Sequence, residues 1–226
     1  MKKISALFFG LAFAAFGDIQ LITNGGFETG NFSSWTVTTN DTPGNGGWFV
    51  TSATSTPLNG FPTVGPHSGA FYAVTDEFEP GSRALTQSFT DPLGATQVVL
   101  SGDIFVNDWF GGSGSGAKVD IIAAGALALT GPSIVVGYGP ADTSVSGGVP
   151  NGWVPFSVDV TAFLTPGTSY QLRIFESDST GPINAGADDL SVLAKTTTIV
   201  GPEPSSVVLL SLICVFFVYR IRKVFA

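Results

Sequence analysis

The chain has 226 residues, enough for one domain of ordinary size and short targeting segments. Between Lys3 and Arg220 four basic residues stand against all 17 acidic residues, so this stretch carries a net charge of −13. A body this acidic repels polyanions, which excludes a nucleic-acid-binding protein. The single cysteine, Cys214, lies near the C-terminus. The domain therefore has no disulfide and must be stabilised by an ordinary core.

The first 17 residues have the pattern of a secretory signal peptide. Lys2 and Lys3 precede the apolar stretch 6–16, which is rich in small residues toward its end. A basic start, a short apolar stretch and a small-residue cleavage site define such peptides. We expect the exported part to begin near Asp18. A retained N-terminal helix or anchor is the alternative.

Residues 18–195 have the composition of an all-β domain. They are rich in Gly, Thr, Ser, Val and Phe, and short β-branched or aromatic runs alternate with turn clusters. Ten strands are expected, at 35–39, 47–52, 70–75, 83–89, 96–106, 117–124, 133–138, 154–160, 169–177 and 188–194. Ten short strands with no convincing helix predict an antiparallel β-sandwich. Residues 123–131 fit either a helical turn or a strand.

Signatures of catalysis are scarce, so we assign no catalytic residue. The only histidine is His67, and no Gly-x-Ser-x-Gly turn supports a Ser-His-Asp arrangement around it. The acidic run 76–80 offers carboxylates for glycoside hydrolysis, but a solvated acidic loop is the simpler interpretation. We therefore expect a non-catalytic protein, with a secreted hydrolase as a minor alternative.

Two segments at the ends of the domain carry a more specific pattern. Asn-Gly-Gly-Phe-Glu followed by Trp, within 24–36, opens the domain, and Asp-Asp-Leu-Ser-Val, 188–192, closes it. Together with 152–179, this pair resembles the jelly-roll modules related to carbohydrate-binding modules and galactose-binding-like domains. The likeness extends over most of 19–194. It implies an all-β, antiparallel jelly-roll sandwich.

The same resemblance implies a structural calcium ion. In the modules that the chain resembles, the Glu of Gly-Phe-Glu and an Asp of the Asp-Asp pair bind Ca²⁺; here these are Glu28 and Asp189, with Asp188 assisting or facing solvent. The first and last strands of a sandwich can lie side by side, so these carboxylates can converge. Converging carboxylates repel one another unless a cation, preferably a hard one, lies between them. The alternative is a turn-capping Asp pair and an exposed Glu without metal.

Extracellular polysaccharide is the ligand that the resemblance implies. Sugar sites use aromatic faces flanked by polar side chains. Trp109 and Phe110, at a strand end beside a glycine-rich loop, are the best candidates, and Trp48 and Tyr72 are further ones. The other two tryptophans are expected in the core. A structural or adhesive matrix protein without specific glycan binding is the alternative.

The C-terminus has the pattern of a processed sorting signal. Pro202, Glu203 and Pro204 precede an apolar run of 13 residues, 207–219. As a helix this run spans about 20 Å, short of the roughly 30 Å hydrocarbon core of a bilayer. It is therefore a marginal permanent anchor but an adequate transient signal. The basic residues that follow, expected to stay cytoplasmic, are Arg220, Arg222 and Lys223.

This arrangement resembles the PEP-CTERM sorting signal, which an exosortase of the inner membrane processes in Gram-negative bacteria that make extracellular polysaccharide. The resemblance implies export across the inner membrane to the cell surface or extracellular matrix, with transient membrane insertion before processing. The alternative is an ordinary single-pass tail anchor. The expected organisation is a signal peptide 1–17, an ectodomain 18–195, a linker 196–201, and a sorting segment 202–226 with a short hydrophobic transmembrane helix 205–221 and a basic tail 220–223.

Overall fold

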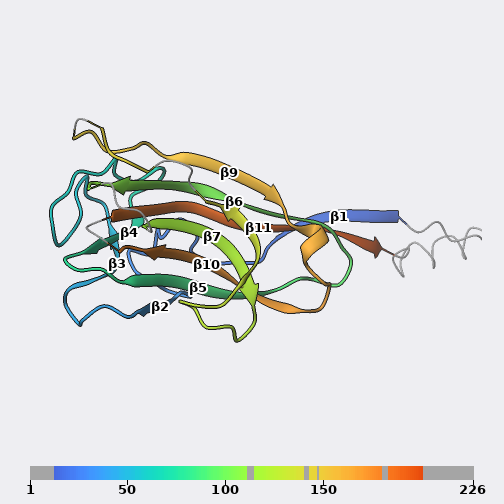
Figure 1. Cartoon of the computed structure of the whole chain (residues 1–226). Helices are drawn as coiled ribbons and strands as arrows, with labels where there is room; N and C mark the ends of the chain where they lie inside the picture. The colour runs from blue at the N-terminus through green and yellow to red at the C-terminus, as the bar shows by residue number, and fades with distance from the viewer. Residues whose placement is uncertain (1–12, 111–114, 140–142, 147, 180–182, 201–226) are drawn as a thin grey trace, which may run out of the picture. The chain divides into compact units, whose positions relative to one another are not determined.

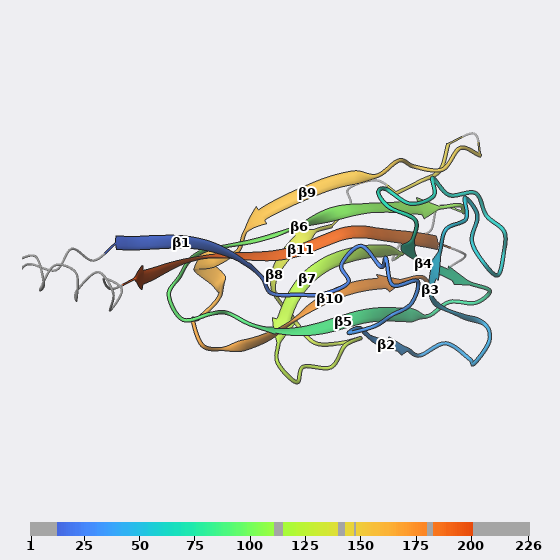
Figure 2. The ribbon, with the colours of Figure 1, turned by 180° about the vertical axis from the view of Figure 1, so that it is seen from behind.

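A computed structural model describes residues 13–110, 115–139, 143–146, 148–179 and 183–200. In these ranges the chain forms two antiparallel β-sheets and one 3₁₀ turn, as Figures 1 and 2 show from opposite sides. The predicted all-β sandwich is confirmed. No helix in the described ranges is long and apolar enough to span a bilayer. The sorting segment 202–226 and the first 12 residues lie outside them.

The two sheets differ in strand order but share the antiparallel pairing. Sheet A has the order β3 (Gly46–Thr51), β4 (Tyr72–Glu77), β11 (Ile183–Val200), β6 (Ala95–Asp108) and β9 (Val154–Asp159), and β1 (Phe13–Gln20) also pairs with β11. Sheet B has the order β2 (Thr36–Thr39), β5 (Ser82–Thr90), β10 (Ser169–Ser177), β7 (Gly116–Ala123) and β8 (Ser133–Tyr138). The 3₁₀ turn, η1, is Thr161–Phe163.

Three segments differ in extent from the elements expected from sequence, or overlap the expected boundaries. Residues 124–131 form turns after β7, so the segment that fitted either a helical turn or a strand is not a strand. Residues 196–200, within the predicted linker 196–201, continue β11 with Thr, Ile and Val residues. Strand β1 begins inside the range predicted as a signal peptide. Residues 18–196 form one compact unit.

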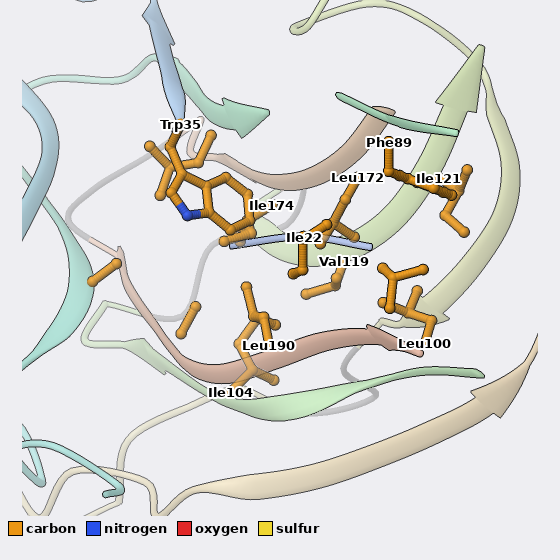
Figure 3. Packing of buried hydrophobic residues seen from close by; sticks show 14 of the residues in the cluster. Ile22, Trp35, Phe89, Leu100, Ile104, Val119, Ile121, Leu172, Ile174 and Leu190 are labelled. Carbon is orange, nitrogen blue, oxygen red and sulfur yellow. The ribbon is translucent and has the colours of Figure 1, made fainter. Parts of the chain in front are cut away.

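The hydrophobic core lies between the two sheets of the 18–196 unit. Alternate side chains of each strand point inward. Leu172 and Ile174 on β10 face this core from sheet B, and Leu100 and Ile104 on β6 face it from sheet A (Figure 3). Tyr170, two residues before Leu172 on β10, belongs to the same core. This interior supplies the stability that the absence of disulfides requires.

A second, smaller cluster lies on the other face of sheet A. Tyr72, Val74 and Phe105 are fully buried there, although their strand neighbours point into the main core. Residues 52–71 contribute to this burial, because Tyr72 Oη bonds the carbonyl of Ala53 at 3.0 Å. Gly186 leaves room for the ring of Phe105, since a Cβ there would approach the ring to 2.1 Å. This face of sheet A is therefore partly covered.

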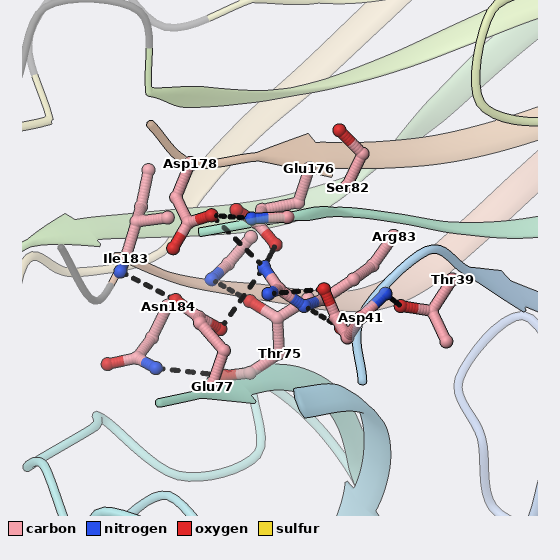
Figure 4. A network of polar contacts seen from close by, with 12 residues as sticks. Thr39, Asp41, Thr75, Glu77, Ser82, Arg83, Glu176, Asp178, Ile183 and Asn184 are labelled. Carbon is pink, nitrogen blue, oxygen red and sulfur yellow. Dashed lines mark hydrogen bonds and ion pairs between the residues drawn. The ribbon is translucent and has the colours of Figure 1, made fainter. Parts of the chain in front are cut away.

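A buried ionic network occupies one end of the space between the sheets. The Arg83 guanidinium donates to Asp41 from Nε and Nη2, at 2.6 and 2.8 Å, and to Glu176 from Nη1 at 2.7 Å. Glu77 and Asp178 lie 3.5 and 3.9 Å from Nη1 (Figure 4). All five side chains are at most 1 % exposed. One cation thus faces four carboxyl groups away from water.

The network overturns the solvated-loop interpretation of residues 76–80. Asp76 and Glu77 are fully buried, whereas Phe78 is 58 % exposed. Asp76 lies on the outer face of sheet A, where its Oδ2 accepts backbone N–H bonds from Leu58 and Asn59. Sequence reasoning failed here because it treats acidic residues as surface residues. The strand continues through both acids, which therefore project to its two faces.

Candidate functional site

The Asn-Gly-Gly-Phe-Glu segment forms a tight turn before β2. Asn24 and Phe27 adopt left-handed backbone conformations, with φ of 52° and 56°. The turn is held from inside by Phe27, which is fully buried and packs on Trp35 with ring centroids 5.6 Å apart. Trp35 Nε1 also donates to the carbonyl of Asn24 at 3.0 Å. Core packing therefore fixes the position from which Glu28 projects.

The Asp-Asp pair lies at an irregularity of β11, where its register against β6 shifts between Asp188 and Ser191. Asp188 is fully buried, and its Oδ2 accepts backbone N–H bonds from His67 and Ser68 at 2.9 and 3.1 Å. Burial raises the pKa of Asp188 to about 6, although these N–H bonds oppose the shift. Asp188 thus faces the protein and anchors the 67–68 backbone, which excludes the solvent-facing alternative.

Asp189 approaches the same two residues, His67 and Ser68, through their side chains, and it remains partly exposed. Its backbone is left-handed, with φ of 50°. Oδ1 accepts a bond from Ser68 Oγ at 2.7 Å, and Oδ2 lies 2.8 Å from His67 Nδ1. Ser68 therefore bonds the carboxylate rather than the imidazole, so these three side chains do not form a Ser-His-Asp relay.

Glu28 reaches the same loop as the two aspartates. Its carboxylate accepts the backbone N–H groups of Ala70 and Phe71 at 3.0–3.1 Å. Gly26 lies beside both aspartates: a Cβ built there would lie 3.5 and 3.6 Å from oxygens of Asp188 and Asp189. The same atom would lie 3.8 Å from Cγ of Glu28.

Asp188 and Asp189 thus both lie beside Gly26, whereas the Glu28 carboxylate bonds the backbone of Ala70 and Phe71. Among the described residues, the titratable base that contacts these acids is His67, whose Nδ1 lies 2.8 Å from Asp189 Oδ2. Carboxylates suit a hard cation such as Ca²⁺. Among the described residues, however, the three ligand atoms that lie within 4.8 Å of one another belong to His67, Asp103 and Asp189, rather than to Glu28 and the Asp pair.

A further acid, Asp103, lies beside this group. Strand register places it on β6 opposite Asp188. Its Oδ2 lies 3.5 Å from His67 Nδ1, and the residue is 9 % exposed. Burial raises its pKa, which His67 opposes. Sequence reasoning did not select Asp103, because only the pairing of β6 with β11 places it there.

The predicted aromatic ligand residues separate into two groups. Trp48 packs in the main core at 5 % exposure, and Tyr72 is fully buried, so neither offers a face to a ligand. Their selection was wrong, because a strand pattern does not reveal which face is covered. Trp109 and Phe110 are accessible, and Phe110 is 65 % exposed.

Trp109 is held in a fixed orientation at the end of β6. Its ring stacks on Phe61, with centroids 5.1 Å apart and an interplanar angle of 19°. Its Nε1 donates to Asn184 Oδ1 at 2.9 Å. Phe110 meets the same Phe61 ring edge-on at 6.3 Å. We call Phe61, Trp109 and Phe110 the aromatic patch; Phe61, which comes from a distant loop, was not predicted.

Comparison with known proteins shows similarity of fold. No protein-family model matches the chain, and no curated protein does so either. Among solved structures, TmCBM61 in complex with β-1,4-galactotriose matches with a TM-score of 0.50 and 16 % identity, over 77 % of this chain and 97 % of that one. The K3 cleaved adhesin domain of Lys-gingipain from Porphyromonas gingivalis W83 matches with a TM-score of 0.50 and 17 % identity, over 78 % and 98 %.

An enzyme also shares this fold. A Stig cyclase, Fisc from Fischerella sp. TAU, matches with a TM-score of 0.52 and 14 % identity, over 80 % of this chain and 99 % of that one. Identities this low establish a common fold, and a common fold hosts different functions. The chain therefore has the β-sandwich architecture found in a carbohydrate-binding module, an adhesin domain and a cyclase.

Proposed function

We propose that the chain is an exported, non-catalytic protein of the cell surface or extracellular matrix, whose sandwich binds polysaccharide at the aromatic patch. The observation that carries this proposal is the exposed ring of Phe110 beside Trp109, whose orientation Phe61 and Asn184 fix. Rigid aromatic faces beside amide groups suit the apolar faces and hydroxyls of sugar rings. The likeness of fold to a carbohydrate-binding module supports the proposal.

The charge of the domain narrows the class of polysaccharide. The stretch between Lys3 and Arg220 carries a net charge of −13, so an acidic polymer is repelled at long range. In native gels containing neutral glucans, galactans or xylans, we expect at least one polymer to retard the protein. Retardation by none of them would favour a matrix protein without specific glycan binding. Retardation by acidic polymers alone would also contradict the proposal.

A structural calcium ion is the second part of the proposal. Glu28 and Asp189 would hold it, and Asp188 would keep the 67–68 backbone in place. The ion would supply positive charge between the carboxylates and link the first turn to the last strand. It is not required for any catalytic step.

Calcium is expected to raise the melting temperature of the metal-free protein. Binding to the folded state alone stabilises by about 2.7 kcal/mol at a hundredfold excess over Kd. Glu28→Gln should abolish the calcium-dependent shift, whereas Asp159→Asn, which changes an exposed acid on β9, should retain it. A wild-type melting temperature that calcium does not change would refute the site.

Export and sorting form the third part of the proposal, and they rest on the two terminal sequence patterns. We expect a host that contains an exosortase to convert the chain to a shorter form lacking its C-terminus. Intact-mass measurement of the membrane fraction should detect the truncation, and Glu203→Ala should reduce it. Equal masses with and without the exosortase would favour the simple tail anchor.

A further inference from the structure

Three side chains of the kinds that bind metal ions, from separate segments, lie close together, and one of them belongs to the Asp-Asp pair. His67 comes from the loop 52–71, Asp103 from β6 and Asp189 from β11. One ligand atom of each lies within 4.8 Å of the others. We propose that His67, Asp103 and Asp189 bind a divalent transition-metal ion, with Zn²⁺ as the best-fitting case, at a site separate from the calcium site.

The distance from His67 Nδ1 to Asp103 Oδ2 suits such an ion, whereas the distance to Asp189 Oδ2 is shorter. His67 Nδ1 lies 2.8 Å from Asp189 Oδ2 and 3.5 Å from Asp103 Oδ2. With metal–ligand bonds of about 2.0–2.2 Å, neighbouring ligands of a tetrahedral zinc lie roughly 3.3–3.5 Å apart. A small outward movement of one carboxylate would therefore admit the ion. Without a metal ion, the short contact between His67 Nδ1 and Asp189 Oδ2 is a hydrogen bond, with its proton on one of these two atoms.

Asp103 is the least exposed of the three ligands. Its side chain is 13 % exposed, against 41 % for His67 and 36 % for Asp189. Loss of hydration disfavours a charged carboxylate unless a positive charge lies nearby. A cation beside Oδ2 would compensate for that loss.

The neighbouring contacts orient two of the ligands. Ser68 Oγ holds Asp189 Oδ1, which leaves Oδ2 directed at His67. The His67 ring meets Trp153 edge-on, with centroids 5.9 Å apart. Such outer contacts fix ligand orientation in metal sites. The His67 and Asp189 side chains are 41 % and 36 % exposed, so an ion and one or more waters can enter.

The donor set discriminates between the two kinds of ion. Imidazole nitrogen favours zinc and its neighbours, whereas calcium prefers an all-oxygen shell. Asp189 can serve both sites without sharing an oxygen, because Oδ1 faces Ser68 and Oδ2 faces His67. The zinc site would fasten the loop 52–71 to the centre of sheet A. It does not depend on the proposed binding of polysaccharide.

The test exploits the fact that His67 is the only histidine in the chain. The full chain is purified without a histidine tag, in a Cys214→Ser background so that no thiol competes for zinc. Zinc is titrated calorimetrically at saturating calcium. We expect one equivalent to bind, with loss of at least about tenfold in affinity for His67→Ala and for Asp103→Asn. Asp159→Asn should bind as the wild type does.

A spectroscopic measurement separates ligation from an indirect effect. Zinc should shift the NMR signals of the single imidazole, and bound Cu²⁺ should show nitrogen hyperfine coupling that His67→Gln removes. If Asp103→Asn does not fold, the two His67 variants, which change a partly exposed side chain, decide the question. No zinc uptake up to about 1 mM, or uptake that survives His67→Ala, would overturn the proposal.

Discussion

Replacing Arg83 with methionine is expected to lower the free energy of unfolding by roughly 3–5 kcal/mol at pH 7. The side chain is fully buried and donates three hydrogen bonds to Asp41 and Glu176. Methionine fills much of the same volume but leaves these carboxyl groups without their cation. Their charges cannot reach water, so they must either remain unpaired or take up protons.

Urea denaturation at pH 5 and at pH 8 measures this effect. We expect the loss to be larger at pH 8, because acid supplies the protons that replace the guanidinium. Lys195→Met, which removes a basic side chain at an exposed position of β11, should change stability by less than about 0.5 kcal/mol. An Arg83→Met protein as stable as the wild type at pH 8 would contradict this account of the network.

The wild-type protein is expected to become less stable as the pH rises from about 5 to about 9. Burial raises the pKa of Glu77 to about 8, against the opposing effect of Arg83, and burial also raises the pKa of Glu176 well above its ordinary value. Both acids are therefore protonated in the folded state at a pH where the unfolded chain has lost those protons. Stability is then highest below the unfolded pKa and is lost as the pH rises through the folded pKa.

The shift of Glu77 alone corresponds to a loss of roughly 3–5 kcal/mol across this interval. Asp178 contributes in the same direction, because burial raises its pKa too. Within the described residues, three carboxyl oxygens of the network accept no hydrogen bond: Glu77 Oε2, Glu176 Oε1 and Asp178 Oδ2. These oxygens can carry the protons that the folded state retains.

Glu77→Gln isolates this contribution. Its amide cannot ionise, so the slope of stability against pH should become shallower than in the wild type. The comparison is made by urea denaturation at fixed calcium concentration, with Asp159→Asn as the control for an exposed acid whose pKa is lowered by its bond to Thr161. Parallel curves for Glu77→Gln and the wild type would show that Glu77 is not the group responsible.

Regular strands were predictable because local pattern and tertiary environment agree in them. Strands β8 and β10 match their predicted limits, since runs rich in β-branched and aromatic residues are bounded by turn residues on both sides. Glu28 and Asp188 bond the same stretch of loop, residues 67–71, which agrees with the expected proximity of the first and last segments. That expectation required only the order of segments, not the register between them.

The buried charges could not be predicted from local pattern. Arg83 pairs with Glu176, 93 residues away, and nothing near either residue distinguishes it from a surface charge. The role of Asp103 depends on the register of β6 against β11, which sequence does not specify. Trp48 and Trp109 both lie in aromatic runs beside glycines, so their different exposure becomes clear only when both faces of sheet A are known.

The most direct test of the central claim is the affinity of the protein for a bound polysaccharide before and after changes in the aromatic patch. Using the polymer that retards the wild type, we expect Phe110→Ala and Trp109→Ala each to weaken binding by at least about tenfold. Phe163→Ala, which removes a similarly exposed ring on η1, should leave the affinity unchanged. Equal affinity of all three variants and the wild type would contradict the claim.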